Sequence, residues 1–420
     1  MNVTIFGDTL QARVFVGLLA EHGHQLFWCQ NPQLENQASA YYVQDESLNH
    51  LLEKQLQKGF LTQINFDQTP VDSDVYILGF SPSEYDVAAQ ILENLAATPL
   101  PHPKLIINGS TFGLHGTEKL KQILPQDHWA YLPDVVQEGN AIQSILQIKQ
   151  IVVGVDSDAS AQMIRELLRP IFYAAHQYLF MPILDAEFTK LSISGMLATR
   201  ISYMNDLALV AEKLGIDILN VRQGLAADSR IGATYLSPGA GFGGENFSHD
   251  ILTLSSTVSE TGMSSRLLTQ VYDINEQQKE ILFRKLWNYY QGNLKHKIIA
   301  IWGASFKENT SSIQNAPIHV MLEALWAQGA IVKLHDPEAL HEIYARYGAR
   351  RDLILCEEQY QATQDADALC LMTAWKQYYS PDFKQLMQLM QHPYVLDGRN
   401  IYDPAYVKAQ GFAYAGVGRA

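Results

Sequence analysis

The sequence predicts an α/β protein with two doubly wound parallel sheets, joined by a long central helix and a helical dimerisation region. Two similar openings support this prediction: Asn2–Phe6 is a short apolar strand that runs into Gly7, and Ile298–Trp302 is another that runs into Gly303. Strand, glycine turn, helix and strand form a βαβ unit, and a series of such units builds a doubly wound sheet. The second strands of the two units are Gln25–Cys29 and Ile331–Leu334.

Between the two α/β parts, Asp185 to Leu214 contains few helix breakers and ends at Gly215, which is a suitable C-cap. Asp217 is placed to cap the next helix. A helix of this length measures about 45 Å and spans domains or packs against a dimer partner; we expect a homodimer. The expected domains are 1–184, 185–295 and 296–420. Four further strands are expected at Val75–Leu78, Leu105–Ile107, Ala368–Met372 and Tyr394–Leu396.

The composition is that of a globular protein with two or three domains in 420 residues. A net charge of −14 and the lack of a basic run argue against nucleic acid as a partner. No apolar run is long enough to cross a bilayer, and the first residues do not read as a signal peptide. The three cysteines are widely spaced, which argues against a disulfide framework or a zinc site. We therefore expect a cytoplasmic protein with no metal.

The segment Ser237–Asp250 reads SPGAGFGGENFSHD. Glycines at this density let a backbone approach a ligand closely. The segment resembles the active-site loop G-F-G-G-S-C-F-P-K-D of the UDP-glucose/GDP-mannose dehydrogenase family, and is most like its UDP-glucose 6-dehydrogenase members. That family oxidises a sugar alcohol to a carboxylate in two steps with NAD, on Rossmann-like sheets, and uses the loop cysteine as covalent nucleophile. The resemblance covers essentially the whole chain.

Other segments carry the same resemblance: DAEFTK, STFGLHGT, LPDVVQEG, DSRIG, GASFKENTSSIQNAP and DGRNIYDP. It implies catalytic positions at Lys190, Asp250, Asn246, Thr111 and Asp134. It implies cofactor-binding positions at Gly7, Thr9, Leu10, Gln30 and Ser110. It implies substrate-binding positions at Glu138, Ser194, Arg230, Phe242, Gly243, Lys307 and Arg399, for a UDP-sugar. UDP-glucose is the favoured substrate, and N-acetylated sugars remain open.

The chain departs from the family at the cofactor turn. A dinucleotide site requires G-x-G-x-x-G, whereas this turn runs from Gly7 to Ala12 as GDTLQA. Thr9 puts a branched side chain where the pyrophosphate lies, and Asp8 adds a negative charge. Gln30 stands where an acidic residue normally binds the ribose, and we expect no arginine nearby to hold the phosphate of NADP. These changes predict weakened NAD binding.

The second departure is at the nucleophile, where Asn246 stands at the cysteine position. A carboxamide cannot attack an aldehyde as a thiolate does, and Ser248 and His249 alter the same loop. Three readings follow. The chain is a dehydrogenase that stops at the aldehyde or proceeds through its hydrate, a UDP-sugar-binding pseudoenzyme that regulates or scaffolds polysaccharide synthesis, or a folded paralogue whose ligand residues are leftovers.

Individual residues also have structural alternatives. Lys190 lies in an apolar helix, where an unpaired charge is costly, so a functional or ion-paired role is favoured over a solvated one. Asp250 is either catalytic or the cap of a helix that begins at Ile251. Thr111 is either a water-orienting residue or a turn residue. Arg399 follows a strand at its carboxyl end, where α/β sheets bind ligands.

Overall fold

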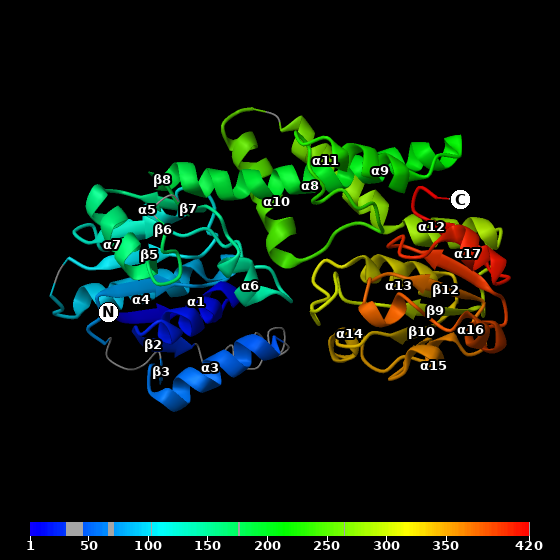
Figure 1. Cartoon of the computed structure of the whole chain (residues 1–420), viewed down its shortest axis with the longest axis horizontal. Coiled ribbons are helices and arrows are strands. Elements are labelled where there is room, and N and C mark those ends of the chain that lie inside the picture. The colour runs from blue at the N-terminus through cyan, green and yellow to red at the C-terminus, as the bar shows by residue number, and fades with distance from the viewer. Residues whose placement is uncertain (31–44, 66–70, 102, 175–176, 264, 420) are drawn as a thin grey trace. The chain divides into compact units, whose positions relative to one another are not determined.

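A computed structural model describes residues 1–30, 45–65, 71–101, 103–174, 177–263 and 265–419, without the side chains of residues 245 and 246. The chain divides into two compact units, Met1–Ile193 and Ser194–Ala420. Each unit is built around one sheet with helices on both faces (Figure 1). The α/β fold with two doubly wound sheets is confirmed, while the three-domain division stays a prediction.

The first sheet has the order β3-β2-β1-β4-β5-β6-β7-β8. Its pairs are parallel except for β6 with β7. The order reverses between β1 and β4, and such a point is where α/β sheets bind ligands. The strands are β1 (Asn2–Phe6), β2 (Gln25–Gln30), β3 (Leu61–Asn65), β4 (Val75–Leu78), β5 (Leu105–Asn108), β6 (His128–Tyr131), β7 (Ile151–Val155) and β8 (Tyr178–Pro182).

Helices cover both faces of this sheet. One apolar core includes residues of α1, α3, α6 and α7, and the other includes residues of α4, α5 and the start of α8. The helical segments are α1 (Leu10–Glu21), α3 (Glu46–Lys58), η1 (Pro82–Glu84), α4 (Tyr85–Ala97), α5 (Gly116–Lys121), α6 (Ala141–Leu146), α7 (Asp158–Leu168) and α8 (Ile183–Leu214).

The second sheet has the order β11-β10-β9-β12-β13-β14, and its pairs are parallel. Its order reverses between β9 and β12, as in a dinucleotide-binding sheet. The strands are β9 (Ile298–Trp302), β10 (Ile331–His335), β11 (Leu353–Leu355), β12 (Ala368–Leu371), β13 (Tyr394–Asp397) and β14 (Ala413–Gly416).

The helices of the second unit also form two layers. Residues of α8, α9, α12, α13 and α14 pack in one core, and residues of α15, α16 and α17 pack in the other. The helical segments are α9 (Ile218–Ala227), α10 (Glu245–Glu260), α11 (Arg266–Lys279), α12 (Ile281–Tyr289), α13 (Pro317–Ala327), α14 (Leu340–Tyr347), α15 (Gln359–Thr363), η3 (Lys376–Tyr378), α16 (Phe383–Leu389) and α17 (Pro404–Ala409).

The predicted long helix is confirmed as α8, which begins two residues before the predicted start and ends at Leu214. Gly215 follows it with a φ of +69°, a left-handed conformation that suits glycine. Asp217 caps α9, since its side chain accepts a hydrogen bond from the Leu219 N–H. The eight predicted strands are present within one residue at each end.

Candidate active site

The turn after β1 requires glycine at its first position. Gly7 has a φ of +97°, and its N–H donates to the Cys29 carbonyl at 3.0 Å. A Cβ atom on Gly7 would lie 2.1 Å from the Gly79 carbonyl oxygen, which is a severe clash. Gly79 follows β4, so the turn lies at the point where the strand order reverses. The predicted cofactor turn therefore has the backbone conformation and the position that a dinucleotide site requires.

Helix α1 begins at this turn, and some of the backbone N–H groups at its N-terminus are available to a ligand. Thr9 is the N-cap; its N–H donates to the Gly79 carbonyl and its hydroxyl accepts from the Ala12 N–H, both at 3.3 Å. An α-helix leaves its first four N–H groups without helical partners. Among the described residues, the N–H groups of Leu10 and Gln11 have no protein acceptor. These two donors can meet an anion at the positive end of the helix dipole.

The negative charge of Asp8 is balanced within the chain. Arg13 donates from Nε and Nη2 to the two Asp8 carboxylate oxygens, at 2.8 and 2.6 Å. Arg13 follows the turn by one helical turn, and these hydrogen bonds hold it on Asp8; the expectation that no arginine is available for the phosphate of NADP stays a prediction. Gln30, the last residue of β2, donates from Nε2 to Asp8 at 3.4 Å. Asp8, Arg13 and Gln30 thus form one polar cluster.

The predicted residues after β5 and β6 have unequal burial. The buried Ser110 joins β4 to β5, since its hydroxyl accepts from the Phe80 N–H at 2.8 Å and donates to the Leu78 carbonyl at 3.2 Å. Thr111 and Glu138 are half-buried. Asp134 is half-buried too, and it accepts from the Val136 N–H at 3.1 Å.

Glu187 was missed by the sequence reasoning, although it lies within the DAEFTK segment. It is buried and accepts three hydrogen bonds, from the His115 N–H and from the N–H and hydroxyl of Thr117. These bonds fix the loop after Thr111 to helix α8. Glu187 precedes Lys190 by three residues, so the two side chains lie on neighbouring positions of the helix.

Lys190 is only 8% exposed, which excludes the solvated alternative. Ser194 lies one helical turn further along α8, and its hydroxyl donates to the Asp250 carboxylate at 2.6 Å. Asp250 is 1% exposed and lies within α10, which begins at Glu245. The alternative that Asp250 caps a helix starting at Ile251 is therefore wrong. Asn246 belongs to the first turn of α10, and its side chain lies outside the described part of the chain.

The glycine-rich loop is held by hydrogen bonds from its own chain. The Asn275 side chain accepts from the Phe242 N–H at 2.8 Å and donates to the Phe242 carbonyl at 3.1 Å. Asn205 accepts from the Gly239 N–H, and Gln278 donates to the Gly239 carbonyl. The Gly244 N–H donates to the carbonyl of Gln314. Three amide side chains and one backbone carbonyl, all far away in sequence, therefore fix the path of this loop.

Close packing within the unit explains several of its glycines. A Cβ atom on Gly243 would lie 2.8 Å from the Asn315 carbonyl oxygen, and one on Gly239 would lie 3.0 Å from that of Gly398. The buried Lys279 donates to the Asn315 side chain at 2.7 Å, and Asn315 in turn donates to the Ser248 hydroxyl at 2.6 Å. These hydrogen bonds connect α11 to the segment before α13, and that segment to α10.

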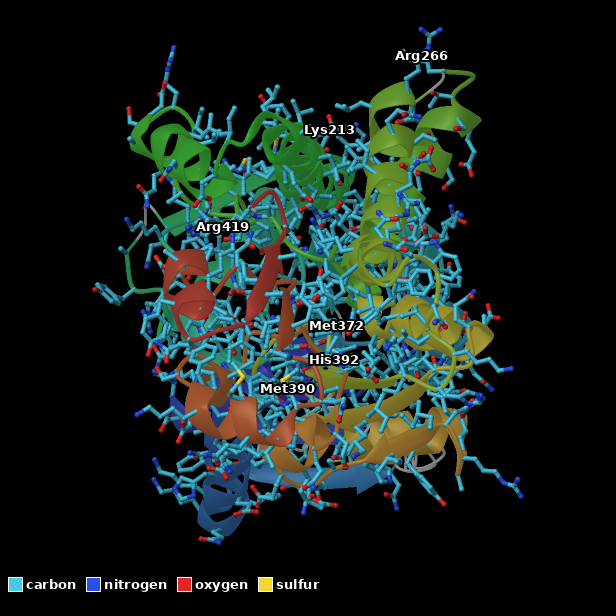
Figure 2. All side chains as sticks on the ribbon, turned by 90° about the vertical axis from the view of Figure 1, so that its right-hand side faces the viewer. Lys213, Arg266, Met372, Met390, His392 and Arg419 are labelled. Carbon is cyan, nitrogen blue, oxygen red and sulfur yellow. The ribbon has the colours of Figure 1, made fainter. Side chains whose placement is uncertain are left out.

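Arg399 lies at the carboxyl edge of the second sheet, after β13. Its Nε donates to the carbonyl of Met372, which follows β12 and is labelled in Figure 2. Its Nη2 donates to the Phe306 carbonyl at 3.2 Å, and Lys307 lies over the Phe306 ring, 5.5 Å from its centre. Burial lowers the pKa of the Arg399 guanidinium from its ordinary value. The loops after β9, β12 and β13 are thus brought together around one arginine.

Arg230 stands apart from this group. Its side chain is 86% exposed and pairs with Asp228 in the loop after α9. Within one chain, Arg230 therefore faces solvent. Among the residues that the structure describes, no three His, Cys, Asp or Glu side chains are arranged to hold a metal ion. No helix in the described ranges has the length and apolar character needed to cross a membrane.

Comparisons with known proteins agree with this architecture along the chain. Residues 1–172 match the NAD binding domain, residues 184–277 the central domain and residues 300–404 the UDP binding domain of one family. The chain belongs to the UDP-glucose/GDP-mannose dehydrogenase family. The family resemblance read from the sequence is confirmed.

Individual relatives support the same assignment. The chain is similar to the UDP-glucose 6-dehydrogenase of Pseudomonas aeruginosa, with 31% identity over 100% of this chain and 98% of that protein. It is 28% identical to the UDP-glucose 6-dehydrogenase of Rhizobium meliloti, over the full length of both. Its fold is similar to the UDP-glucose dehydrogenase of Pyrobaculum islandicum, with a TM-score of 0.87, 22% identity, and coverage of 100% of this chain and 98% of that one.

Proposed function

We propose that this protein is a nucleotide-sugar dehydrogenase that oxidises the 6-hydroxyl of a UDP-glucose-type sugar and lacks the thioester step. The observation that carries the proposal is the buried pair of Ser194 and Asp250, one helical turn from Lys190. A buried carboxylate held by a hydroxyl is a suitable acceptor for a substrate proton.

In this proposal Asp250 accepts the proton of the sugar hydroxyl through a water, and the family resemblance gives Lys190 a part in holding that water. Ser194 orients the Asp250 carboxylate by donating to it. Thr111, Asp134 and Glu138 lie beyond the carboxyl ends of β5 and β6, where they orient water and substrate.

The UDP-sugar would bind at the carboxyl edge of the second sheet. Arg399 and Lys307 supply positive charge for the nucleotide part, and guanidinium groups suit phosphate and ribose oxygens. Phe242 and Gly243 belong to the loop that the Asn275 amide holds in place. A UDP binding domain match over residues 300–404 supports this placement.

The cofactor turn fits NAD in its backbone. Gly7 keeps the required conformation, and the N–H groups of Leu10 and Gln11 are available for the pyrophosphate. When bound, NAD supplies the acceptor for the two electrons that leave the sugar carbon. Thr9 and Gln30 predict weaker binding than in family members with glycine and an acidic residue at these positions.

Asn246 limits the reaction to one oxidation. Its amide nitrogen lone pair is delocalised, so it cannot form the covalent adduct that a thiolate forms. We therefore expect the reaction to stop at the aldehyde; further oxidation through the aldehyde hydrate, which needs no thiol, is the alternative course. The side chain would act only as a donor or acceptor of hydrogen bonds.

A pseudoenzyme is the second candidate, and the Thr9 side chain favours it. The Thr9 hydroxyl already uses the Ala12 N–H, which removes one donor from the helix N-terminus. In this case the chain would bind a UDP-sugar through the Arg399 region and act as regulator or scaffold in polysaccharide synthesis.

The test is calorimetric titration with NADH, with and without UDP-glucose, followed by a count of NADH formed from NAD for each UDP-glucose consumed. Saturable NADH binding and one NADH per sugar support the limited dehydrogenase. Binding of UDP-glucose without NADH binding or turnover contradicts it and supports the pseudoenzyme.

We also propose a homodimer through α8. Large apolar side chains at Met196, Tyr203, Val210 and Leu214 are 52–67% exposed. Spacings of seven, seven and four residues place them on one face of the helix. A second copy of the chain is the partner that would cover this face. Light scattering of the protein and of a Tyr203→Lys variant tests this: a monomeric mass for the unmodified chain contradicts it.

A further inference from the structure

The cofactor turn contains a carboxylate that the family pattern does not require. Asp8 follows Gly7, and its side chain is 12% exposed. Gln30, at the carboxyl end of β2, reaches this carboxylate with its amide nitrogen. In dinucleotide-binding sheets an acidic residue near the end of the second strand binds the ribose hydroxyls. Here the carboxylate is that of Asp8, which comes from the turn and is hydrogen-bonded to Gln30 at the end of the second strand.

The partners of Asp8 hold its side chain in place but do not occupy all of its hydrogen-bond acceptor sites. Arg13 donates two hydrogen bonds, one to each carboxylate oxygen, and Gln30 donates one. An ionised carboxylate offers about four acceptor sites. Three donors come from the described residues, so one acceptor site is left for a hydroxyl group. Gln30 is itself oriented by Gln63, whose amide donates to the Gln30 side-chain oxygen at 3.4 Å.

We propose that Asp8 recognises the adenosine ribose and selects a dinucleotide without a 2′-phosphate. The inference rests on the proposed function, because it assumes that the turn binds a nicotinamide dinucleotide. Asp8 accepts a hydrogen bond from a ribose hydroxyl, and its negative charge repels a phosphate at the same place. Gln30 contributes by orienting the carboxylate and adds a neutral hydrogen bond.

Arg13 binds the Asp8 carboxylate. Its Nε and Nη2 both donate to Asp8, and its guanidinium lies 5.6 Å from the centre of the Trp28 ring. Its side chain is 10% exposed. Removal of the Asp8 charge would take away the negative charge that Arg13 faces in this turn and leave a cation beside the ribose site, which would favour the phosphate of NADPH. The selectivity for NADH over NADPH therefore depends on Asp8 and Arg13 together.

The test measures NADH and NADPH binding by calorimetry for the unmodified protein and for Asp8→Asn. We expect the unmodified protein to bind NADH at least tenfold more tightly than NADPH. Asp8→Asn should lose about tenfold in NADH affinity and gain in NADPH affinity, and the double variant Asp8→Asn with Arg13→Met should lose the NADPH gain. Asp72→Asn is the matched control, since it breaks the ion pair with Lys104 before β4, at the opposite edge of the sheet.

The outcomes separate this inference from the proposed function. If Asp8→Asn binds NADH tightly and its ratio of NADH affinity to NADPH affinity is unchanged, the inference about Asp8 is overturned and the proposed function is not. A preference of the unmodified protein for NADPH has the same consequence. Binding of neither dinucleotide overturns both proposals. If Asp8→Asn fails to fold by circular dichroism, Asp8→Glu replaces it, because the charge is kept while the carboxylate moves by one methylene. An unchanged ratio in that variant also overturns the inference.

Discussion

Ser194 and Asp250 are joined by a 2.6 Å hydrogen bond between helices α8 and α10, and both side chains are buried. The residues are 56 positions apart in the sequence. Their bond fixes the first part of α10, which also contains Asn246, against the middle of the long helix. A buried carboxylate requires such a donor, since burial without hydrogen bonds is costly.

Replacement of Ser194 by alanine should lower the free energy of unfolding by about 1–3 kcal/mol, because Asp250 loses a buried donor. Urea denaturation measures this change. Ser256→Ala is the control, since Ser256 is exposed on the same helix and its hydroxyl donates to the Thr253 carbonyl. Equal effects of the two substitutions would show that the Ser194–Asp250 bond has no special role in stability.

Replacement of Asn246 by cysteine should restore the second oxidation. A thiolate can attack the aldehyde and carry it to a thioester, which water then cleaves. We expect two NADH for each UDP-glucose in place of one, measured by absorbance and by the sugar acid formed. Asn246→Ser is the control, because a hydroxyl is a weaker nucleophile. A single NADH from the cysteine variant would contradict the role given to position 246.

Replacement of Arg399 by alanine should weaken UDP-glucose binding by about 1.5–3 kcal/mol, the scale of a hydrogen bond to a charged group. Calorimetry measures the affinity directly. Arg350→Ala is a matched control: Arg350 pairs with Asp352 in the loop before β11, away from the carboxyl edge of the sheet. If both variants bind as the unmodified protein does, Arg399 does not contact the nucleotide.

Replacement of Gly7 by alanine should destabilise the protein more than Gly23→Ala does. Both glycines have positive φ, +97° and +91°, which costs a side chain about 1–2 kcal/mol. Only Gly7 adds a clash, with the Gly79 carbonyl oxygen, and overpacking costs about 1–3 kcal/mol more. Thermal unfolding and NADH titration measure both effects. Similar melting temperatures for the two variants would rule out the close approach at Gly79.

Stability should fall as the pH drops from 7.5 to 5.5, in part through His319. Burial lowers the pKa of His319 below the ordinary value of 6.5. Its neutral ring accepts from the Tyr347 hydroxyl and donates to the Ile313 carbonyl, each at 2.6 Å. The unfolded chain takes up the proton first, so the contribution is complete above pH 6.5 and is lost as the pH falls toward the lowered folded pKa.

Thermal unfolding of the protein, of His319→Gln and of His341→Gln at the two pH values measures this dependence. We expect a smaller drop in melting temperature for His319→Gln. His341 is exposed, so its replacement should leave the drop unchanged. A drop of the same size in all three proteins would exclude His319 as a contributor.

The fold was readable because apolar runs bounded by glycine mark the buried parallel strands. Strand β8, which reads YLFMP, was missed although its residues form an apolar run; it lies at the edge of the first sheet and is only partly buried. The βαβ openings at Gly7 and Gly303 could be predicted because the strain of a positive φ requires glycine at both.

The candidate site was only partly readable. Its positions came from family motifs, but the partners that hold them lie elsewhere in the chain. Asn275 is 33 residues from Phe242, and its two hydrogen bonds to that backbone leave no sequence pattern. Arg13 was overlooked because a cation five residues after Asp8 on a helix surface commonly remains solvated. The glycines of the glycine-rich loop were interpreted as ligand contacts, whereas Gly239 and Gly243 also pack closely against the backbone of neighbouring segments.

The boundary between the two compact units falls inside helix α8, between Ile193 and Ser194. Lys190 and Ser194 lie on opposite sides of this boundary and are separated by a helical rise of about 6 Å. Because both residues belong to one continuous helix, the spacing between their points of attachment is set by the helix itself and is kept as long as α8 is unbroken.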